Sequence, residues 1–309
     1  MPDYVHKPVM MAEVLEALKP RAGGRYADGT LGGAGHAAAM LAASSPDGWL
    51  SGCDRDGVAI EAATKRLAEF AGRFELRQGN FAEFAEWIPQ ASCDGVLLDL
   101  GVSSPQLDVA ERGLSFMNDG PLDMRMDQSQ GVTAADLVNG SPTEELANIF
   151  WKYGDERDSR RFARAIEMDR RTRRFETTKQ LADLIERLSP RAGRKAHPAT
   201  KVFQALRIAV NDEMGSLERG LVAALKILKP GGRLVVITFH SLEDGMTKRW
   251  MRDRARDYEF DGEKDIPELR RPRTPEVKLV NRKSIAPGEA EIESNPRSRS
   301  AQLRVIEKM

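Results

Sequence analysis

A glycine-rich segment near the N-terminus has the residue types of a ligand-binding turn. Asp28 is followed by Gly-Thr-Leu-Gly-Gly-Ala-Gly and then by His36. The segment joins a predicted strand, Arg25–Asp28, to a predicted helix, His36–Ala43, and a helix N-terminus offers unpaired N–H groups. At the strand tip, Asp28 can accept a hydrogen bond from the amino group of an amino-acid cofactor. The segment has neither the Lys-Ser/Thr ending of a P-loop nor the Gly-x-Gly-x-x-Gly order, although dinucleotide binding remains the alternative.

Polar residues also follow the next two predicted strands. Trp49–Cys53 ends at Asp54, whose carboxylate can accept hydrogen bonds from both hydroxyls of a ribose. The alternative is that Asp54 is the N-cap of the next helix. Phe74–Gln78 ends near Asn80 and Phe81. The Asn80 amide can form a hydrogen bond with the edge of an adenine, and the Phe81 ring can cover the face of that base. Because the carboxyl ends of parallel strands meet at one edge of a sheet, these groups should line one crevice.

A fourth predicted strand, Asp94–Leu98, leads into Asp99 and then into Ser104, Pro105 and Gln106. This turn resembles the polar-Pro-Pro-aromatic turn of methyltransferases that act on exocyclic amines, with Gln106 in place of the second proline. The lone pair of such an amine is delocalised, so a side-chain oxygen and a rigid carbonyl must orient it, and no covalent nucleophile is needed. We expect Ser104, Pro105 and Asp99 to be the catalytic group.

A second local pattern supports the same class. Lys-Pro-Gly-Gly at residues 229–232 is expected to form a turn before an apolar strand, Arg233–Phe239. This arrangement resembles the turn that precedes the fifth strand of class I methyltransferases. Together with the three earlier strand ends, it favours a methyltransferase over a dehydrogenase.

The order of elements predicts a doubly wound α/β fold with a Rossmann-like sheet. Strands and helices alternate over the first hundred residues, which implies parallel crossovers and a sheet covered on both faces. The pattern stops between residues 106 and 208 and resumes with a helix at Ser216–Leu228. Within the gap we predict three helices, the first and third capped by threonine: Thr143–Tyr153, Ser159–Asp169 and Thr178–Leu188. We therefore expect one domain of residues 1–105 and 209–309, with an inserted helical domain at 106–208.

Composition narrows the setting. The chain of 309 residues has 47 basic and 47 acidic side chains, and no apolar run approaches a membrane span. The two cysteines, Cys53 and Cys93, lie in apolar strand-like runs, and no targeting signal is evident, so a cytoplasmic protein is expected. The four scattered histidines give no case for a metal site.

Basic residues are concentrated between positions 152 and 201, within the expected insertion. They include Arg160, Arg161, Arg164, Arg170, Arg171, Arg173, Arg174, Arg191, Arg194 and Lys195. Such a cluster indicates contact with a polyanion such as nucleic acid, and the alternative is a solvated helix face.

Several segments together resemble one family, the bacterial small-subunit ribosomal RNA cytosine-N4 methyltransferase H family, also called MraW. The most specific is Gly120–Asp127, Gly-Pro-Leu-Asp-Met-Arg-Met-Asp. The others are His6–Met10, Asp28–His36, Asp99–Leu107, Glu111–Gly113, His197–Thr200, Phe203–Asn211, Phe239–Asp244 and Asn295–Arg304. The resemblance implies a cytidine in the decoding region of 16S rRNA as target, within the small ribosomal subunit. It also implies contacts with S-adenosyl-L-methionine at Ala34, Gly35, His36, Asp54, Phe81, Asp99 and Gln106.

Some alternatives stay open at this stage. Asp123, Arg125 and Asp127 either position a nucleotide or form an internal salt-bridge knot, and His240 either faces the site or is a satisfied loop residue. The chain can instead be a DNA amino methyltransferase or a non-catalytic rRNA-binding scaffold, and either a monomer or a dimer.

Overall fold

We describe the protein from a computed structural model, over residues 8–103, 107–190, 197–260 and 265–309. The chain forms two compact units: residues 1–101 with 216–309 (unit 1), and residues 102–215 (unit 2). The sequence predicts the first boundary after residue 105, which is four residues later than in the structure. It predicts the second after residue 208, which is seven residues earlier. Asn211 explains the second difference, because its amide bonds Met124 O and Met126 N of unit 2, both at 2.8 Å.

A seven-stranded sheet forms the centre of unit 1, in the order β3-β2-β1-β4-β5-β9-β8. The first five strands run parallel, and β9 and β8 continue the sheet antiparallel. Their bounds are β1 Arg25–Asp28, β2 Trp49–Asp54, β3 Phe74–Gln78, β4 Cys93–Asp99, β5 Leu228–Thr238, β8 Val277–Leu279 and β9 Gln302–Lys308. The predicted doubly wound, Rossmann-like sheet is confirmed.

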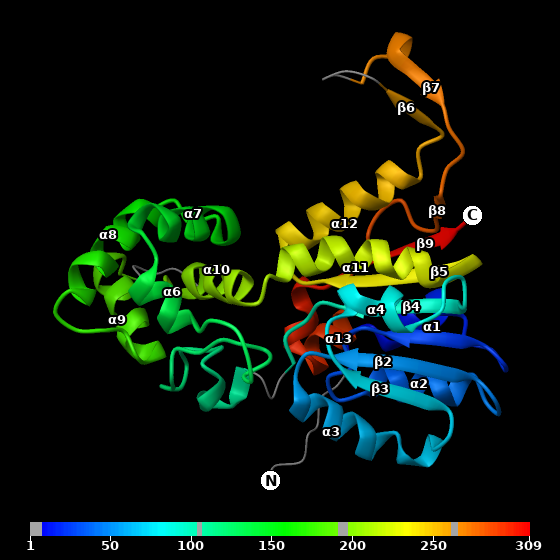
Figure 1. The fold of residues 1–309 in the computed structure, drawn as a ribbon, viewed down its shortest axis with the longest axis horizontal. Helices are drawn as coiled ribbons and strands as arrows, with labels where there is room; N and C mark the ends of the chain where they lie inside the picture. The colour runs from blue at the N-terminus through cyan, green and yellow to red at the C-terminus, as the bar shows by residue number, and fades with distance from the viewer. Residues whose placement is uncertain (1–7, 104–106, 191–196, 261–264) are drawn as a thin grey trace. The chain divides into compact units, whose positions relative to one another are not determined.

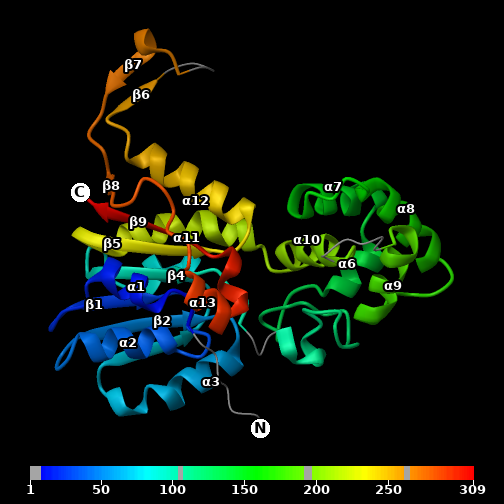
Figure 2. The same ribbon diagram turned by 180° about the vertical axis from the view of Figure 1, so that it is seen from behind.

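Helices cover both faces of this sheet. On one face lie α1 (Met11–Leu18), α2 (Gly35–Ala43) and α3 (Gly57–Arg66), which share a buried apolar cluster with Leu97 and Val235. On the other lie α4 (Phe84–Trp87), α11 (Glu213–Ile227) and α12 (Ser241–Arg254) (Figures 1 and 2). The central strand residues Val96, Leu97 and Leu98 are all buried, as expected for a strand covered on both sides.

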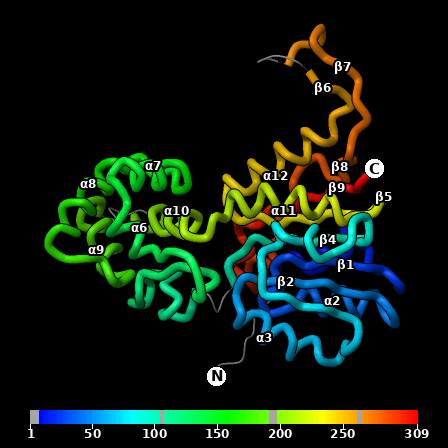
Figure 3. The backbone as a smooth tube through the Cα atoms, viewed as in Figure 1, coloured from blue at the N-terminus to red at the C-terminus, as the bar shows by residue number. Residues whose placement is uncertain are grey.

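Beyond α12 the chain forms a two-stranded antiparallel hairpin, β6 (Tyr258–Phe260) and β7 (Arg270–Pro272), which extends from the end of that helix (Figure 3). It then returns through β8, and α13 (Glu289–Ser294) precedes β9. No helix among the described residues is both long and apolar enough to span a membrane.

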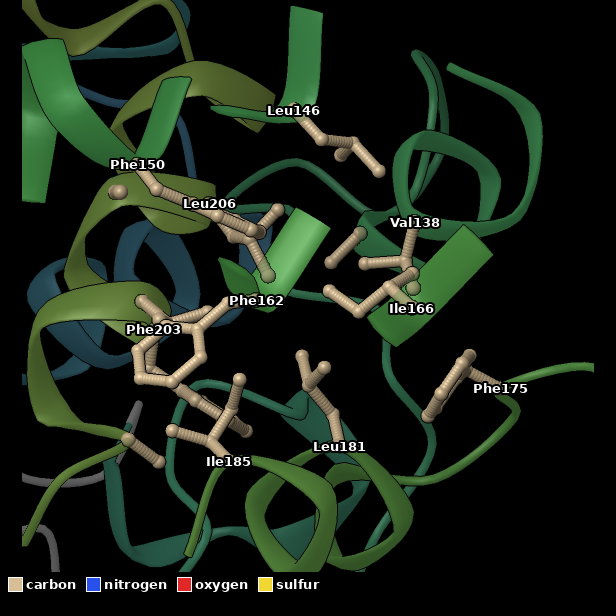
Figure 4. Packing of buried hydrophobic residues seen from close by; sticks show 14 of the residues in the cluster. Val138, Leu146, Phe150, Phe162, Ile166, Phe175, Leu181, Ile185, Phe203 and Leu206 are labelled. Carbon is tan, nitrogen blue, oxygen red and sulfur yellow. The ribbon is translucent and has the colours of Figure 1, made fainter. Parts of the chain in front are cut away.

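Unit 2 is helical. Its longer helices are α6 Ala134–Gly140, α7 Thr143–Gly154, α8 Ser159–Arg170, α9 Thr178–Leu188 and α10 Thr200–Val210. Apolar residues one turn apart on each helix meet in one core (Figure 4). Phe150, Phe162, Ile185 and Leu206 are at most 1% exposed.

Two local expectations are wrong. Residues 229–232 are a bulge within β5 and not a turn before it, since Cys93 and Gly95 pair with Leu228 and Arg233. Thr143 does not cap α7: Pro142 holds the N-cap position, and the Thr143 hydroxyl donates to Glu167 at 2.6 Å. At α9, by contrast, Thr177 forms a capping box with Gln180.

Close packing of α7 against α10 depends on one glycine. A Cβ on Gly154 would lie 2.6 Å from the backbone oxygen of Lys201, an atom that cannot move away independently. We expect Gly154→Ala to lower the free energy of unfolding by about 1–3 kcal/mol. Gly140 is the matched control, because it also ends a helix and a Cβ there would meet nothing within 4 Å. Urea unfolding should find Gly140→Ala neutral or slightly stabilising. Equal behaviour of the two variants would contradict the packing argument.

Candidate active site

The order of the strands fixes where a ligand can bind in unit 1. From β1 the chain continues to β2 on one side, whereas β4 lies on the other side of β1, so the strand order reverses between β1 and β4. In open parallel sheets such a reversal opens a crevice at the carboxyl ends of the strands. Asp28 and Asp99 end these two neighbouring strands, and Asp54 ends β2.

The glycine-rich turn after β1 is bound tightly to this edge. Gly29 N donates to Leu97 O at 3.0 Å, and the Thr30 hydroxyl accepts from Asp99 N at 2.7 Å. Thr30, whose role no sequence pattern indicates, links β4 to the turn across 69 residues. The turn ends at Ala34, which has a left-handed backbone (φ 54°), is fully buried and precedes α2 at its N-cap.

Two glycines of the turn are required by packing inside the protein. A Cβ on Gly29 would lie 2.6 Å from atoms of both Leu98 and Phe81, and one on Gly35 would lie 2.1 Å from Pro8. Gly35 therefore lets the chain at Pro8 lie directly against the first turn of α2. This contact places Pro8 next to the site.

Asp54 holds the turn from the second strand. One carboxylate oxygen accepts from Gly32 N and the other from Asp56 N, both at 2.9 Å. Asp56, not Asp54, caps α3 by accepting from Val58 N at 3.1 Å. The N-cap alternative for Asp54 is therefore excluded. Its side chain is partly exposed, so a ligand can approach it.

Asp28 is buried (1% exposed) and accepts from Thr30 N at 3.0 Å. Burial, together with the nearby charges of Asp99 and Asp54, raises the pKa of its carboxyl from 3.8 to about 7, against the opposing effect of the Thr30 hydrogen bond. A cationic ligand bound nearby would therefore favour the ionised form of this carboxyl near neutral pH.

His36 carries the opposite shift. Burial lowers the pKa of its imidazole from 6.5 to about 4, so the ring is neutral at physiological pH. Its Nε2 lies 2.9 Å from Val9 O, and since a carbonyl only accepts, Nε2 must hold the proton. Nδ1 is then an acceptor, 3.9 Å from Asp99 Oδ2. Two acceptors this close suit a ligand group that donates hydrogen bonds, such as an amine.

Residues after β3 are mostly occupied within the protein. The Asn80 side chain accepts from Ala82 N at 3.0 Å and donates to Ser216 at 2.8 Å, so it caps the next turn. Phe81 is 8% exposed, and a Cβ on Gly220 of α11 would lie 2.2 Å from its ring. An adenine contact by these two residues stays a prediction.

Three predicted site residues, Ser104, Pro105 and Gln106, lie outside the described residues. The chain leading to them is ordered by Asp99, whose Oδ1 accepts from Gly101 N at 3.1 Å. Gly101 contacts the Phe239 ring closely: a Cβ there would lie 2.8 Å from it. Asp99 thus contributes both to the crevice and to the start of the expected catalytic turn.

In unit 2 the Gly120–Asp127 segment forms the internal knot. Arg125 and Asp123 make a bidentate pair, with both N–O distances 2.8 Å, and this pairing lowers the pKa of Asp123 despite its partial burial. Asp127 accepts from Ser129 and Gln130.

The basic residues of unit 2 divide into two kinds. Arg170 is structural, since it donates to the carbonyls of Val138 and Ser141, each at 2.8 Å. Arg161 similarly donates to Leu188 O at 2.7 Å. By contrast, exposed side chains available to a polyanion include Arg160, Arg164, Arg173 and Arg174.

His240 is a helix cap. It precedes α12, where its ring accepts from Glu243 N while the Glu243 carboxylate accepts from Phe239 N and His240 N. His240 therefore caps α12 through Nδ1, whereas its buried Nε2 lies 2.9 Å from Glu243 Oε1 without a hydrogen bond among the described residues.

The arrangement of unit 1, with its reversed strand order and acidic strand ends around a glycine turn, is that of a Rossmann-like methyltransferase that uses S-adenosylmethionine. A model of one family, the MraW methylase family, matches residues 3–309. The chain belongs to that family.

Curated relatives match over their full length. A protein of Citrifermentans bemidjiense is 52% identical over 314 residues, covering 100% of both chains. One of Geobacter sulfurreducens is 51% identical over 311 residues (99% of each chain), and one of Symbiobacterium thermophilum is 48% identical (99% of this chain, 97% of the other). All three are named ribosomal RNA small subunit methyltransferase H. Among solved structures, an rRNA methylase from Streptococcus thermophilus aligns with a TM-score of 0.44 at 10% identity, covering 99% of this chain and 98% of that one.

The raised pKa of Asp28 predicts how stability depends on pH. The folded state keeps a proton that the unfolded state releases between pH 3.8 and about 7. The stability contributed is therefore present below pH 3.8 and lost as the pH rises towards 7. We expect Asp28→Asn to exceed the wild type in free energy of unfolding at about pH 8, by on the order of 2–4 kcal/mol, with the gap closing in acid.

Asp94→Asn is the control, because its free energy of unfolding should change in the opposite direction. Partial burial raises the pKa of Asp94, but the Arg25 N–H, Lys229 and Arg21 outweigh it and the net pKa is lowered. Urea unfolding without cofactor should show this variant losing stability at neutral pH. A destabilised Asp28→Asn protein above pH 7 would contradict the assignment.

Proposed function

We propose that this protein transfers the methyl group of S-adenosyl-L-methionine to N4 of a cytidine in the decoding region of 16S rRNA, in the cytoplasm. The observation that carries the methyl-transfer part is the joining of Asp28, Asp54, Asp99 and His36 around one glycine turn. The full-length relatives named for small-subunit rRNA support the substrate.

The residues fit the cofactor by chemistry. Its cationic groups suit an edge that carries Asp28 and Asp99, and its ribose suits the partly exposed carboxylate of Asp54. Ala34, Gly35 and His36 would contribute through the start of α2, and Phe81 and Gln106 would border the adenosine. When bound, the cofactor supplies an electrophilic methyl group.

The chain's own contribution to the reaction is orientation. Ser104 and the Pro105 backbone would accept the two N–H bonds of the cytosine amine and so direct its lone pair. Asp99 shapes this turn through Gly101 and lies beside the neutral acceptor His36. The methylated nitrogen becomes strongly acidic, so water suffices as the proton acceptor, and positioning and fixed dipoles supply the catalysis.

Unit 2 would hold the RNA. A base within structured RNA must be splayed out before its amino group can enter a pocket. The exposed Arg160, Arg164, Arg173 and Arg174 would bind the backbone, and the rigid Asp123–Arg125 knot would shape the surface. The inserted helical domain is thus proposed as the RNA-recognition domain.

The decisive experiment is mass spectrometry of 16S rRNA nucleosides from cells with and without this protein. We expect N4-methylated cytidine in the decoding region to disappear without it. Purified protein should restore the mark on small subunits from the deleted strain. Methylation of DNA alone would indicate a DNA amino methyltransferase, and binding without transfer would indicate a scaffold.

Asp54→Ala should weaken S-adenosylmethionine binding by about 1.5–3 kcal/mol, because a charged acceptor is removed. Calorimetry measures this directly. Glu61→Ala is a suitable control, as it removes an exposed carboxylate from the neighbouring α3. Unchanged affinity in the Asp54 variant would remove this residue from the cofactor site.

Ser104→Ala should lower the single-turnover rate on the order of a hundredfold, with cofactor and RNA affinity nearly intact. The reason is that its hydrogen bond strengthens as the target nitrogen becomes positive. Ser103→Ala is the comparison: a rate loss there, with a wild-type rate for the Ser104 variant, would transfer the role to the neighbour.

A further inference from the structure

A shallow pocket on unit 1 is lined by cations. Its lining residues come from α12, from β8 and the loop after it, and from β9, and α12 packs against both of these strands. Lys248 and Arg252 come from successive turns of α12, Arg282 from the loop and Arg304 from β9. None of its lining residues is acidic.

Three of these four cations lack the carboxylate partner that neighbouring arginines have. Arg304 is bidentate to Asp244 at 2.7 and 3.0 Å, and Arg254 pairs with Glu276 at 2.6 Å. Lys248, Arg252 and Arg282 have no carboxylate within salt-bridge distance among the described residues. Their charges are thus not neutralised by the parts of the chain that the structure describes.

Neighbouring positive charges on one surface attract an anion. Lys248 and Arg252 are four residues apart on one helix face, where like charges repel. Arg282 adds a third positive charge from another element. An anion that contacts all three removes the repulsion, and a phosphate offers several oxygens for this purpose.

The shape and the polar groups of the pocket restrict the ligand further. It is too shallow for a base, whereas a phosphate can contact the three cations from outside. Asn281, the neutral polar residue in the lining, is fully engaged: it donates to Lys283 O and Leu303 O and accepts from Val305 N. Asn281 is therefore not offered to a ligand, and the groups left to contact one are the cations.

We propose that Lys248, Arg252 and Arg282 form a binding site for a backbone phosphate of RNA, a second contact of the substrate on unit 1 itself. The proposal rests on the proposed rRNA substrate. Such a contact fixes the register and orientation of the RNA without reading its sequence.

The test compares the triple variant Lys248→Ala/Arg252→Ala/Arg282→Ala with the wild type in binding purified small-subunit rRNA at several salt concentrations. We expect affinity at low salt to fall at least tenfold, and the salt slope to decrease by about one unit for each phosphate that the variant no longer binds. Affinity for S-adenosylmethionine and the melting temperature should not fall. An unchanged salt slope, or a lower melting temperature that accompanies the weaker binding, would overturn the proposal.

Charge reversal at single positions supplies the matched control. Arg252→Glu should weaken rRNA binding, whereas Arg249→Glu should not, because Arg249 is exposed on the same helix and its side chain lies back over Gly245. Equal effects of the two reversals would show a general charge effect and contradict a defined site. Wild-type protein that binds rRNA with the expected salt dependence but transfers no methyl group would refute the proposed function alone.

Discussion

The reversal of strand order between β1 and β4 is the constraint on which the rest of the site depends. It places Asp28 and Asp99 side by side at one edge of the sheet, and Thr30 bonds the two strand ends together through Asp99 N. The glycine turn, the start of α2 and the carboxylate of Asp54 are then held around this point by main-chain hydrogen bonds. The groups proposed to bind the cofactor are therefore fixed by rigid elements, which lowers the cost of ordering them on binding.

Burial sets the protonation states within this frame. The same removal from solvent raises the pKa of the Asp28 carboxyl to about 7 and lowers that of His36 to about 4. Both groups are thereby biased toward their neutral forms in the folded protein, since burial penalises the charged form of each. A cationic ligand changes the balance for Asp28, because it favours the carboxylate. The Asp28 carboxyl can consequently be neutral in the folded protein without cofactor and ionised when the cationic S-adenosylmethionine is bound.

Local sequence patterns predict most strands and helices of unit 1. Most features that they do not predict depend on contacts between residues far apart in the sequence. The bounds of Arg25–Asp28 and Phe74–Gln78 match the structure because a glycine follows each strand directly, at Gly29 and Gly79. The bulge in β5 was not predictable, since it depends on pairing with β4. Thr30 and the Val9–His36 contact were missed for the same reason. The short α6 has too few residues for a helical period to show, and α10 was noticed only through its resemblance to a family segment.

The central claim is that the β1–β4 edge binds S-adenosylmethionine next to Asp28. Calorimetric titration in two buffers of different ionisation enthalpy, at about neutral pH, measures the protons exchanged on binding. Wild-type protein should release a proton fraction that Asp28→Asn does not, because the cationic cofactor lowers the pKa of Asp28. Subtracting the variant removes the titration of the cofactor itself. Identical proton exchange by the two proteins, with cofactor bound to both, would contradict the account.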